Sequence, residues 1–414
     1  MGWNSWDSYG LSVTAGEFKA NVDWLHHHLQ PYGWQYVVVD EGWYLDHPGA
    51  TGDQGFNLSP DGRYLPAPGR FPSNTAGLGL KALADYAHSL GLKFGIHIIR
   101  GIPRKAVEQN LPIADSPYHA ADAADTTDRC SWNSDNYGLK DNAAAQAYYD
   151  SIAKLYAGWG VDFLKVDCIS RPYKAAEIHM MSAALKHSGR PIVLSLSPGP
   201  TPVDEAGDVR KYAQMWRISD DMWDLWSKSG SQTFPQSIVG QVPVLARWAP
   251  HVEPGHWPDA DMLPIGYLGP RPGWGDPRQS RFTPDETRTL LTLWCMARSP
   301  LILGANLTRL DPATTSLLTN REVLAVDQHS TGNHPVVATP QTAVWTAHLN
   351  EGDEVVAVVN LSDAKQTLTY PWNTLGLKKA AYQVRDLWEK KDHGRQPALS
   401  VTLAPHATAL FKLQ

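Results

Sequence analysis

Eight short apolar runs alternate with helix-like stretches along about the first 325 of the 414 residues, and this pattern constrains the fold most strongly. The helix-like stretches have apolar residues three or four apart, as after the predicted Thr14–Glu17 capping box, where Phe18, Val22 and Leu25 follow. Eight alternating strands and helices predict a parallel sheet closed as a (β/α)8 TIM barrel. The strand-like runs are 2–6, 36–40, 93–99, 163–167, 192–197, 215–219, 256–261 and 301–303.

The pattern changes near residue 330, where short β-like runs follow one another without helices between them. These runs are 336–338, 343–345, 355–359, 382–384 and 409–411, and a turn is expected at 350–353. We therefore predict a barrel over residues 1–328 and a C-terminal antiparallel β-sandwich domain over residues 329–414.

Two long polar stretches interrupt the barrel pattern, at about 46–76 and 102–140. Ordinary connections between strands and helices are much shorter. We expect the first stretch to form a loop over a functional site and the second to be a polar insertion.

Polar side chains stand at the C-terminal ends of the predicted strands, where a barrel places its active site. One acid in such a position is often only a helix N-cap, but acids after several strands of one barrel are expected to converge. The sequence therefore predicts an acidic site. Its ten candidates are Trp6, Asp40, Glu41, His97, Lys165, Asp167, Ser197, Arg217, Asp221 and Asp261.

Asp167 and Asp221 have different neighbours, which predicts different protonation states. Lys165 lies two residues before Asp167 and points to the same side of a strand, so it is expected to lower the pKa of Asp167, as a nucleophile requires. Asp220 and partial burial are expected to raise the pKa of Asp221, which suits a general acid. Such a pair is typical of a glycosidase. The alternative for Asp220 and Asp221 is a solvated loop pair.

Composition and motifs exclude several other functions. A net charge of -6 without a basic stripe argues against nucleic-acid binding, and no apolar run approaches the ~18 residues of a membrane span. Dinucleotide, P-loop and α/β-hydrolase motifs are absent. Asp259 with Asp261 lacks the further ligands of a calcium loop, and His26–His28 would point around a helix. We expect no metal and no cofactor.

The three cysteines Cys130, Cys168 and Cys295 form no CxxC pair and require no disulfide framework. The chain opens on structured-looking sequence without a visible signal peptide. We expect a secreted or periplasmic protein if a leader has been trimmed and a cytoplasmic one otherwise. The sequence indicates no oligomeric state.

Six motifs in order resemble glycoside hydrolase family 27, the α-galactosidase family of clan D, and the resemblance runs essentially end to end. It implies a cofactor-free, retaining exo-glycosidase that hydrolyses terminal α-D-galactosyl residues of galactosides or galactose-configured oligosaccharides. The motifs are Met1–Trp6, Asp40–Trp43, Lys93–Ile96, Leu164–Cys168, Trp216–Arg217 with Asp221, and Trp257–Met262.

The resemblance also implies a role for each candidate. Asp167 would be the nucleophile and Asp221 the acid/base, with carboxyl groups about 5–5.5 Å apart. Trp6 would stack on the sugar ring, and Asp261 would lie near the acid/base. Asp40 and Glu41 would form hydrogen bonds to O4 and O6 of the sugar. Lys165 would bind O3 and O4, and Arg217 would bind O2.

Three positions depart from the usual family pattern and bear on the substrate. Glu41 replaces a usual Asp, which resembles members that act on β-L-arabinopyranosides, sugars shaped like galactose but lacking C6. Ser197 replaces a Glu that binds O2, which resembles members that accept an N-acetyl group. His97 replaces a usual Tyr. Together with Arg100 and the second insertion, it indicates that the rim of the sugar site is reshaped.

The sequence favours an α-galactosidase over two alternatives, a β-L-arabinopyranosidase and then an α-N-acetylgalactosaminidase. Stereochemistry does not separate the first two, because both sugars present the same ring face to the carboxylates. A sugar-binding pseudoenzyme is disfavoured because both carboxylates are present. A transglycosylase would use the same residues.

Overall fold

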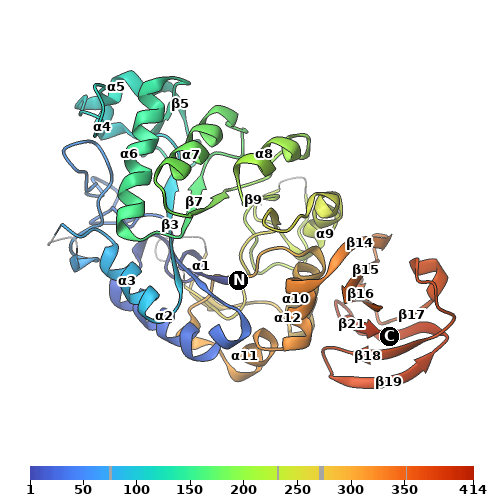
Figure 1. Cartoon of the computed structure of the whole chain (residues 1–414). Coiled ribbons are helices and arrows are strands. Elements are labelled where there is room, and N and C mark those ends of the chain that lie inside the picture. The colour runs from blue at the N-terminus through green and yellow to red at the C-terminus, as the bar shows by residue number, and fades with distance from the viewer. Residues whose placement is uncertain (74–76, 231–232, 270–274, 351) are drawn as a thin grey trace. The chain divides into compact units, whose positions relative to one another are not determined.

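The computed structural model describes residues 1–414 except 74–76, 231–232, 270–274 and 351, and the chain forms two compact units (Figure 1). The first unit comprises Met1–Arg217, Gly266–Gln279 and Ile302–Leu310, and the second comprises Ile218–Ile265, Ser280–Leu301 and Asp311–Gln414. Helix α12 (Arg321–His329) ends just before strand β14 begins at Thr331. The domain boundary between residues 328 and 329 stays a prediction.

Eight strands form one sheet in the order β10-β9-β8-β7-β3-β2-β1-β13, and the neighbours from β13 to β9 pair in parallel. The predicted TIM-barrel class with a C-terminal β-sandwich is confirmed. The strands are β1 (Gly2–Asn4), β2 (Tyr36–Val39), β3 (Lys93–Ile99), β7 (Phe163–Asp167), β8 (Val193–Leu196), β9 (Met215–Arg217), β10 (Trp257–Asp259) and β13 (Ile302–Leu303).

The strand interiors read as nearly continuous apolar runs because both faces of the sheet are covered. Val37, Ile96 and Leu164 are fully buried, and α3, α6 and α7 lie along the outside of β3 and β7 (Figure 1). The first strand is shorter than predicted. It ends at Asn4, whose Oδ1 accepts a 2.8 Å hydrogen bond from the backbone N–H of Trp6, and Trp6 begins helix α1 (Trp6–Tyr9).

The predicted start of the first long helix is confirmed. Helix α2 (Ala15–His28) is capped by Thr14, which forms the expected capping box with Glu17, and its apolar face is buried. The other helices are α3 (Lys81–Ser89), α4 (Arg104–Glu108), α5 (Ala120–Ala123), α6 (Ala143–Trp159), α7 (Ala175–His187), α8 (Ala206–Tyr212), α9 (Ile238–Trp248), α10 (Pro284–Ala297) and α11 (Pro312–Leu318).

The insertion at 102–140 contains helices α4 and α5 and a small antiparallel sheet. Its strands are β4 (Ile102–Pro103), β6 (Asn136–Leu139) and β5 (Ala124–Arg129), in that order. A disulfide, which the sequence did not require, joins Cys130 after β5 to Cys168 after β7. The described part of the 46–76 stretch contains no α-helix and no strand longer than an isolated bridge. A further antiparallel pair joins β11 (Tyr267–Leu268) and β12 (Arg278–Gln279).

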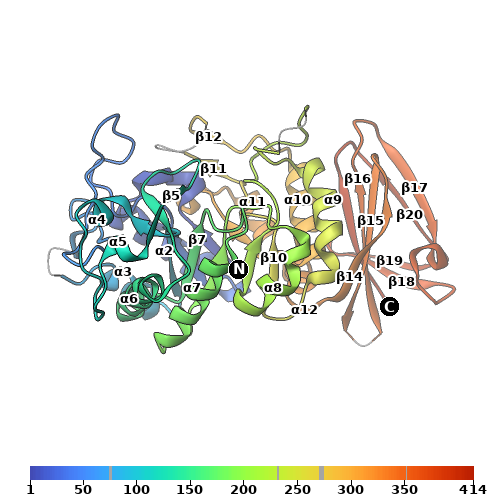
Figure 2. The same ribbon diagram turned by 90° about the horizontal axis from the view of Figure 1, so that it is seen from above.

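The C-terminal sandwich has a six-stranded sheet in the order β14-β15-β16-β21-β18-β19 and a two-stranded sheet of β17 and β20. Figure 2 shows β17 and β20 as a layer beside β15 and β16, and Val356, Val358 and Leu399 belong to the core that the two layers share. The strands are β14 (Thr331–Ala338), β15 (Thr342–Asn350), β16 (Asp353–Asn360), β17 (Gln366–Pro371), β18 (Tyr382–Asp386), β19 (Lys391–Gln396), β20 (Ala398–Leu403) and β21 (Thr408–Leu413). The predicted turn at 350–353 connects β15 to β16, and its residue 351 lies outside the described residues.

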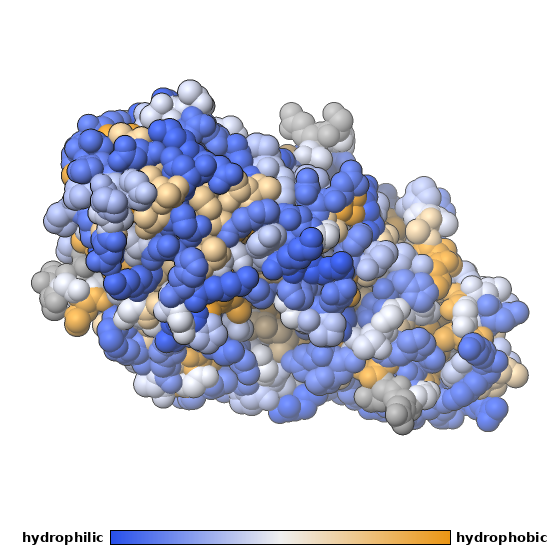
Figure 3. Space-filling model, turned by 45° about the horizontal axis from the view of Figure 1, so that its top comes forward, coloured by the Kyte–Doolittle hydropathy of each residue, from blue (hydrophilic) through white to orange (hydrophobic). Residues whose placement is uncertain are grey.

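The face drawn in Figure 3 is largely hydrophilic, with smaller hydrophobic areas between the polar ones. Three large apolar side chains in the described part of the chain are more than a third exposed: Leu78, Trp132 and Phe234. Among the described helices, none combines the length and the apolar character needed to cross a membrane.

Candidate active site

Asp40 follows β2 and accepts hydrogen bonds from three donors. The amide of Asn4 and the ammonium of Lys165 bond its Oδ2 at 2.6 and 2.8 Å, and the backbone N–H of Glu41 bonds its Oδ1 at 2.8 Å. Burial opposes the charge, but Lys165 and then His97 hold the pKa of Asp40 well below its usual range. Asp40 is therefore an ionised hydrogen-bond acceptor at neutral pH.

Asp167 ends β7 and is surrounded by three polar side chains from other segments. The indole Nε1 of Trp132 donates to its Oδ1 at 3.0 Å, the hydroxyl of Ser197 donates to its Oδ2 at 3.3 Å, and His97 Nε2 lies 3.3 Å from the same Oδ2. Burial opposes ionisation, yet the hydrogen bond and charge of His97, followed by the charge of Lys165, lower the pKa of Asp167. The side chain remains 14% exposed, so this carboxylate is both ionised and accessible.

The expected direction of the Asp167 pKa is confirmed, but the expected main cause was wrong. The ammonium of Lys165 bonds Asp40, and His97 is the cation in contact with Asp167. In the register of β3 and β7, His97 lies opposite Lys165 and Ile99 lies opposite Asp167, so His97 reaches Asp167 diagonally. Burial lowers the pKa of His97, but the charges of Asp40 and Asp167 raise it above its usual value overall.

Glu41 follows Asp40 directly in the sequence, yet its environment raises its pKa instead of lowering it. Burial, together with the charges of Asp167, Asp40 and Asp135, raises the pKa of Glu41 to about 7 against the opposing charge of His97. Its Oε1 accepts a 2.7 Å hydrogen bond from the amide of Asn133. The same amide nitrogen lies 3.3 Å from Oδ2 of Asp135 and so joins two carboxyl groups. Near neutral pH, Glu41 is therefore close to half-protonated.

Trp6, Ser197 and Arg217 complete the candidates of the first unit. Trp6 begins α1 and is half-buried beside Asn4, and Ser197 follows β8 and reaches Asp167. Arg217 ends β9 and is buried, and its backbone carbonyl accepts hydrogen bonds from Thr201. Direct contacts thus join Lys165 to Asp40 and join both His97 and Ser197 to Asp167, and the backbone N–H of Glu41 bonds Asp40.

Asp221 and Asp261 lie in the second unit. Asp221 is half-buried, and its backbone carbonyl accepts a 2.7 Å hydrogen bond from Gln236. Asp261 is buried, and its Oδ2 accepts a 2.7 Å hydrogen bond from the backbone N–H of Met222. Asp261 therefore orders the backbone next to Asp221. The separation of about 5–5.5 Å between the carboxyls of Asp167 and Asp221 stays a prediction.

The expectation that Arg100 shapes a rim was wrong, because Arg100 is 2% exposed. Its guanidinium bonds Glu177 at 2.5 Å and Asp128 at 2.7 and 3.0 Å, and these two acids compensate the buried cation. Its Nε donates to the backbone carbonyl of Cys168 at 2.7 Å. Arg100 therefore supports the backbone immediately after Asp167.

Sequence reasoning missed Asn4, Trp132 and Asn133. Asn4 could have been found, because it lies two residues before Trp6 in the first predicted strand and so shares its face. Trp132 and Asn133 lie in the insertion, which has no periodicity that predicts where its side chains point. The Cys130–Cys168 disulfide, with Cα atoms 5.9 Å apart, holds this segment next to Asp167.

The site combines an ionised, accessible carboxylate with fixed acceptors and a cation that can bind vicinal hydroxyl groups. No group of three or more His, Cys, Asp or Glu side chains in the described part of the chain is arranged to hold a metal ion. This chemistry, at the C-terminal ends of barrel strands, fits the glycosidases.

Comparison with known proteins defines the family. A profile described as alpha galactosidase A matches residues 133–329, and one described as the alpha galactosidase C-terminal beta sandwich domain matches residues 339–413. Among curated relatives, the alpha-galactosidase of Cyamopsis tetragonoloba is 28% identical over 420 residues, covering 100% of this chain and 85% of its own length.

Solved structures are more similar still. A β-L-arabinopyranosidase of glycoside hydrolase family 27 from Geobacillus stearothermophilus is 46% identical, with a TM-score of 0.94, over 100% of this chain and 95% of that chain. A variant of that enzyme has been solved in complex with arabinose. A protein of Bacillus halodurans C-125 assigned as an α-N-acetylgalactosaminidase is 41% identical, with a TM-score of 0.88, over 100% of this chain and 96% of that chain. The chain belongs to glycoside hydrolase family 27, and it is a glycoside hydrolase.

Proposed function

We propose that the protein is a retaining exo-acting β-L-arabinopyranosidase. The observation that carries this proposal is the presence of Glu41 at a position where the family's α-galactosidases usually have a shorter Asp. Asn133 holds the Glu41 side chain, and the Glu41 backbone bonds Asp40. The longer side chain would occupy the space that a C6 hydroxymethyl group needs. The 46% identity with an arabinopyranosidase, against 28% with an α-galactosidase, also supports this substrate over α-D-galactosides, which the sequence had favoured.

In the proposed mechanism, Asp167 attacks the anomeric carbon while Asp221 protonates the departing glycosidic oxygen. The C–O bond to the leaving group breaks and an ester between the sugar and Asp167 forms. Asp221, now ionised, then takes a proton from water as the water attacks the anomeric carbon and releases Asp167. Two inversions give net retention.

The surrounding residues would bind the sugar and tune the nucleophile. Asp40 and Lys165 would bind O3 and O4 as a pre-paired acceptor and donor, and Arg217 would reach O2. Trp6 would cover the apolar face of the ring. His97 would keep Asp167 ionised, which its contact with Oδ2 supports.

A panel of p-nitrophenyl glycosides tests the substrate. We expect kcat/KM for the β-L-arabinopyranoside to exceed that for the α-D-galactopyranoside by about tenfold or more, because a pocket discriminates one extra carbon group by roughly 10–200-fold. A higher value for the α-galactoside would overturn the proposal. Glu41→Asp is expected to move the preference toward the galactoside, and an unchanged ratio would remove Glu41 as the selector.

An α-N-acetylgalactosaminidase is the second candidate. Ser197 leaves room where many members have a Glu, and the 41% identity with the Bacillus halodurans protein supports this alternative. Its own assay is p-nitrophenyl α-N-acetylgalactosaminide. The arabinopyranosidase proposal requires that this substrate be turned over more slowly than the arabinopyranoside.

A further inference from the structure

A histidine of the C-terminal sandwich stands where its turn favours glycine. Strands β20 and β21 are joined by a tight turn, in which the backbone N–H of Ala407 donates to the carbonyl of Ala404 at 3.2 Å. Pro405 precedes His406, and the φ of His406 is 63°, in the left-handed region. This is the pattern of a type II β-turn, whose third residue is usually Gly or Asn. A side chain that departs from the local preference of its turn is a candidate for a role outside the turn.

The ring of His406 is held at both of its nitrogens. Nδ1 lies 2.8 Å from Oε1 of Glu286, a buried residue of α10, and Nε2 lies 2.8 Å from Oδ1 of Asp363, an exposed residue after β16. The hydroxyl of Thr289, about one turn further along α10, donates to the backbone carbonyl of His406 at 2.6 Å. These three contacts fix the plane of the ring relative to α10.

The face of this ring lies against the indole of Trp226. The two ring centres are 3.9 Å apart and the planes are inclined by 17°, so the rings are stacked. Aromatic pairs in contact stabilise a structure beyond the area that they bury. The stack therefore fixes the sandwich against residues 221–226, the segment that begins at the proposed acid/base Asp221.

Residues 221–226 are bonded at both ends to the residues at the start of α9. The backbone N–H of Gln236 donates to the carbonyl of Asp221 at 2.7 Å, and that of Val239 donates to the carbonyl of Trp226 at 2.9 Å. Because both ends are bonded to the same neighbouring segment, we expect a displacement at one end to reach the other. The position of the indole is thereby coupled to the position of the proposed acid/base.

A second path leads from His406 to the same segment through Glu286. The other oxygen of this carboxyl, Oε2, accepts a 2.8 Å hydrogen bond from the backbone N–H of Thr283, the N-cap of α10. Two residues earlier, the backbone N–H of Arg281 donates to Oδ2 of Asp224 at 3.0 Å, and the side chain of Asp224 is fully buried. The histidine and the cap of α10 thus hold two side chains of the segment.

We propose that the C-terminal sandwich positions the acid/base of the reaction, with His406 as the positioning residue. This inference rests on the proposed function, in which Asp221 protonates the departing glycosidic oxygen. A misplacement of about 1 Å in a reacting group costs on the order of 100-fold in rate, so a smaller displacement has a measurable effect. The sandwich then contributes to catalysis through the position of Asp221 rather than through contact with the sugar.

The test uses two substrates that differ in how much the leaving group needs a proton. The phenolate that leaves dinitrophenyl β-L-arabinopyranoside is stable without one, whereas phenyl β-L-arabinopyranoside depends on the general acid. His406→Asn removes the ring, and asparagine tolerates the left-handed backbone of this turn. We expect kcat/KM to fall about tenfold for the phenyl glycoside and to stay within about twofold for the dinitrophenyl glycoside. Equal losses on both substrates, or no loss on either, would overturn the inference.

His179→Asn is the matched control for the loss of a histidine. His179 on α7 stacks on Tyr212 with ring centres 3.8 Å apart, and its Nε2 lies 2.9 Å from Oδ2 of Asp208. The control variant therefore loses the same kinds of contact at another place in the chain. It should keep the wild-type ratio between the two kcat/KM values.

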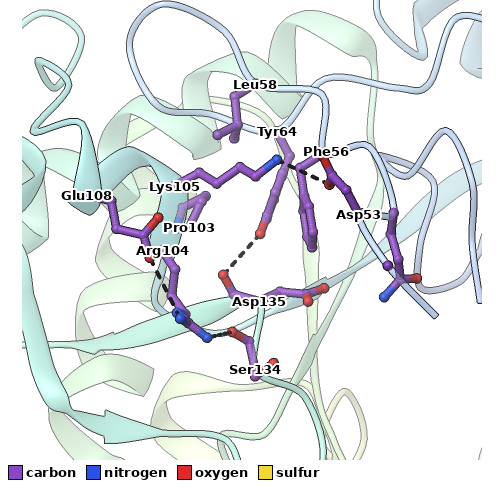
Figure 4. Close-up of a pocket in the computed structure, with 12 residues that line it drawn as sticks. Asp53, Phe56, Leu58, Tyr64, Pro103, Arg104, Lys105, Glu108, Ser134 and Asp135 are labelled. Atoms are coloured by element: carbon purple, nitrogen blue, oxygen red, sulfur yellow. Dashed lines mark hydrogen bonds and ion pairs between the residues drawn. The ribbon is translucent and has the colours of Figure 1, made fainter. Parts of the chain in front are cut away.

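Trp226→Leu removes the other partner of the stack, and it decides the question by the same ratio if His406→Asn does not fold. We expect the same selective loss on the phenyl glycoside, and an unchanged ratio would overturn the inference. The control is Phe56→Leu. Phe56 is half-buried like Trp226, and it stacks on Tyr64 at the wall of a pocket that opens to the surface (Figure 4).

The proposed acid/base and its positioning can fail separately. Asp221→Asn, measured first, should lose far more activity on the phenyl glycoside than on the dinitrophenyl glycoside. Equal losses in that variant would overturn the proposed role of Asp221. A selective loss in Asp221→Asn together with the wild-type ratio in His406→Asn would overturn the role of the sandwich alone. If the wild type prefers galactosides, the same two aryl groups are placed on galactose.

Discussion

Asp40 and Glu41 are neighbours in the chain, but different regions of the molecule hold them. Asp40 is fixed by Asn4 and Lys165, which stand on barrel strands, and its pKa lies well below the usual range. Glu41 is held by Asn133 of the insertion, and its pKa is raised to about 7. Although the two residues are adjacent in the sequence, the carboxyl of Asp40 lies near the cations of the barrel strands, whereas the carboxyl of Glu41 lies near other acidic side chains.

This difference separates two properties of the site. The barrel strands supply charges that keep Asp40 and Asp167 ionised, as the proposed mechanism requires. The insertion supplies Trp132 and Asn133, which contact Asp167 and Glu41, and we propose that it adjusts the substrate preference without replacing the proposed reacting groups. The variants below separate the two contributions.

Asp167→Asn tests the barrel's contribution most severely. We expect kcat on p-nitrophenyl β-L-arabinopyranoside to fall by about 10⁴-fold or more, because a neutral amide cannot form the glycosyl ester. Initial rates measure the loss, and Asp150→Asn, at a half-buried acid of α6 that pairs with His187, is the control. Activity within tenfold of the wild type would place the nucleophile elsewhere.

Glu41→Gln tests whether the pKa of Glu41 is raised, in contrast to the lowered pKa of Asp40. The pKa rises from 4.5 to about 7 on folding. Stability from this group is therefore fully present below pH 4.5 and is lost as the pH rises through 7, in total about 3 kcal/mol. Thermal unfolding between pH 5 and 8 should show a downward trend in the wild type that is shallower in the variant. Identical trends would contradict the raised pKa.

His97→Leu removes the cation in contact with Asp167. Without it the pKa of Asp167 rises, so the acidic limb of the kcat/KM profile should move upward by about one to two pH units. Below the new pKa the loss is about tenfold or more, and it shrinks as the pH approaches 8. His97→Gln, which keeps a donor, is the comparison variant. An unmoved acidic limb in His97→Leu would mean that Lys165 alone keeps Asp167 ionised.

Asn133→Ala should have the smallest effect of these variants on the catalytic rate, and it should change the preference between substrates. Losing its hydrogen bond frees Glu41 and raises the Glu41 pKa further, so we expect the arabinopyranoside-to-galactoside ratio to fall about fivefold. The control is Gln109→Ala, an exposed amide in the same insertion. Parallel losses on both substrates would assign Asn133 to general support of the site instead.

Much of the barrel could be predicted from the sequence, because parallel strands that are buried on both faces consist of consecutive apolar residues. Strand β7 has the predicted bounds, and α2 begins at its predicted cap. Strands β17, β19 and β20 of the sandwich were not predicted. β19 (Lys391–Gln396), for example, is polar throughout, so no apolar run reveals it.

The errors at the site have a common cause. Lys165 was paired with Asp167 because they are two residues apart, but His97 of the neighbouring strand β3 contacts Asp167, and Asp40, which follows β2, contacts Lys165. Arg100 was assigned to a rim because it follows His97 on the same strand and precedes the second insertion. Burying its charge is costly unless the charge is paired, and Glu177 and Asp128, which come from other segments, pair with it.

The sequence by itself determined the fold class, the family and the strand-end positions of the candidate residues, because periodicity and motif order are local properties of the chain. Only the tertiary structure decided which cation accompanies which carboxylate, and that Asn133 reaches Glu41 across 92 residues. Those pairings depend on strand register and on how an irregular insertion packs. Both are set by contacts between distant segments, which no local pattern records.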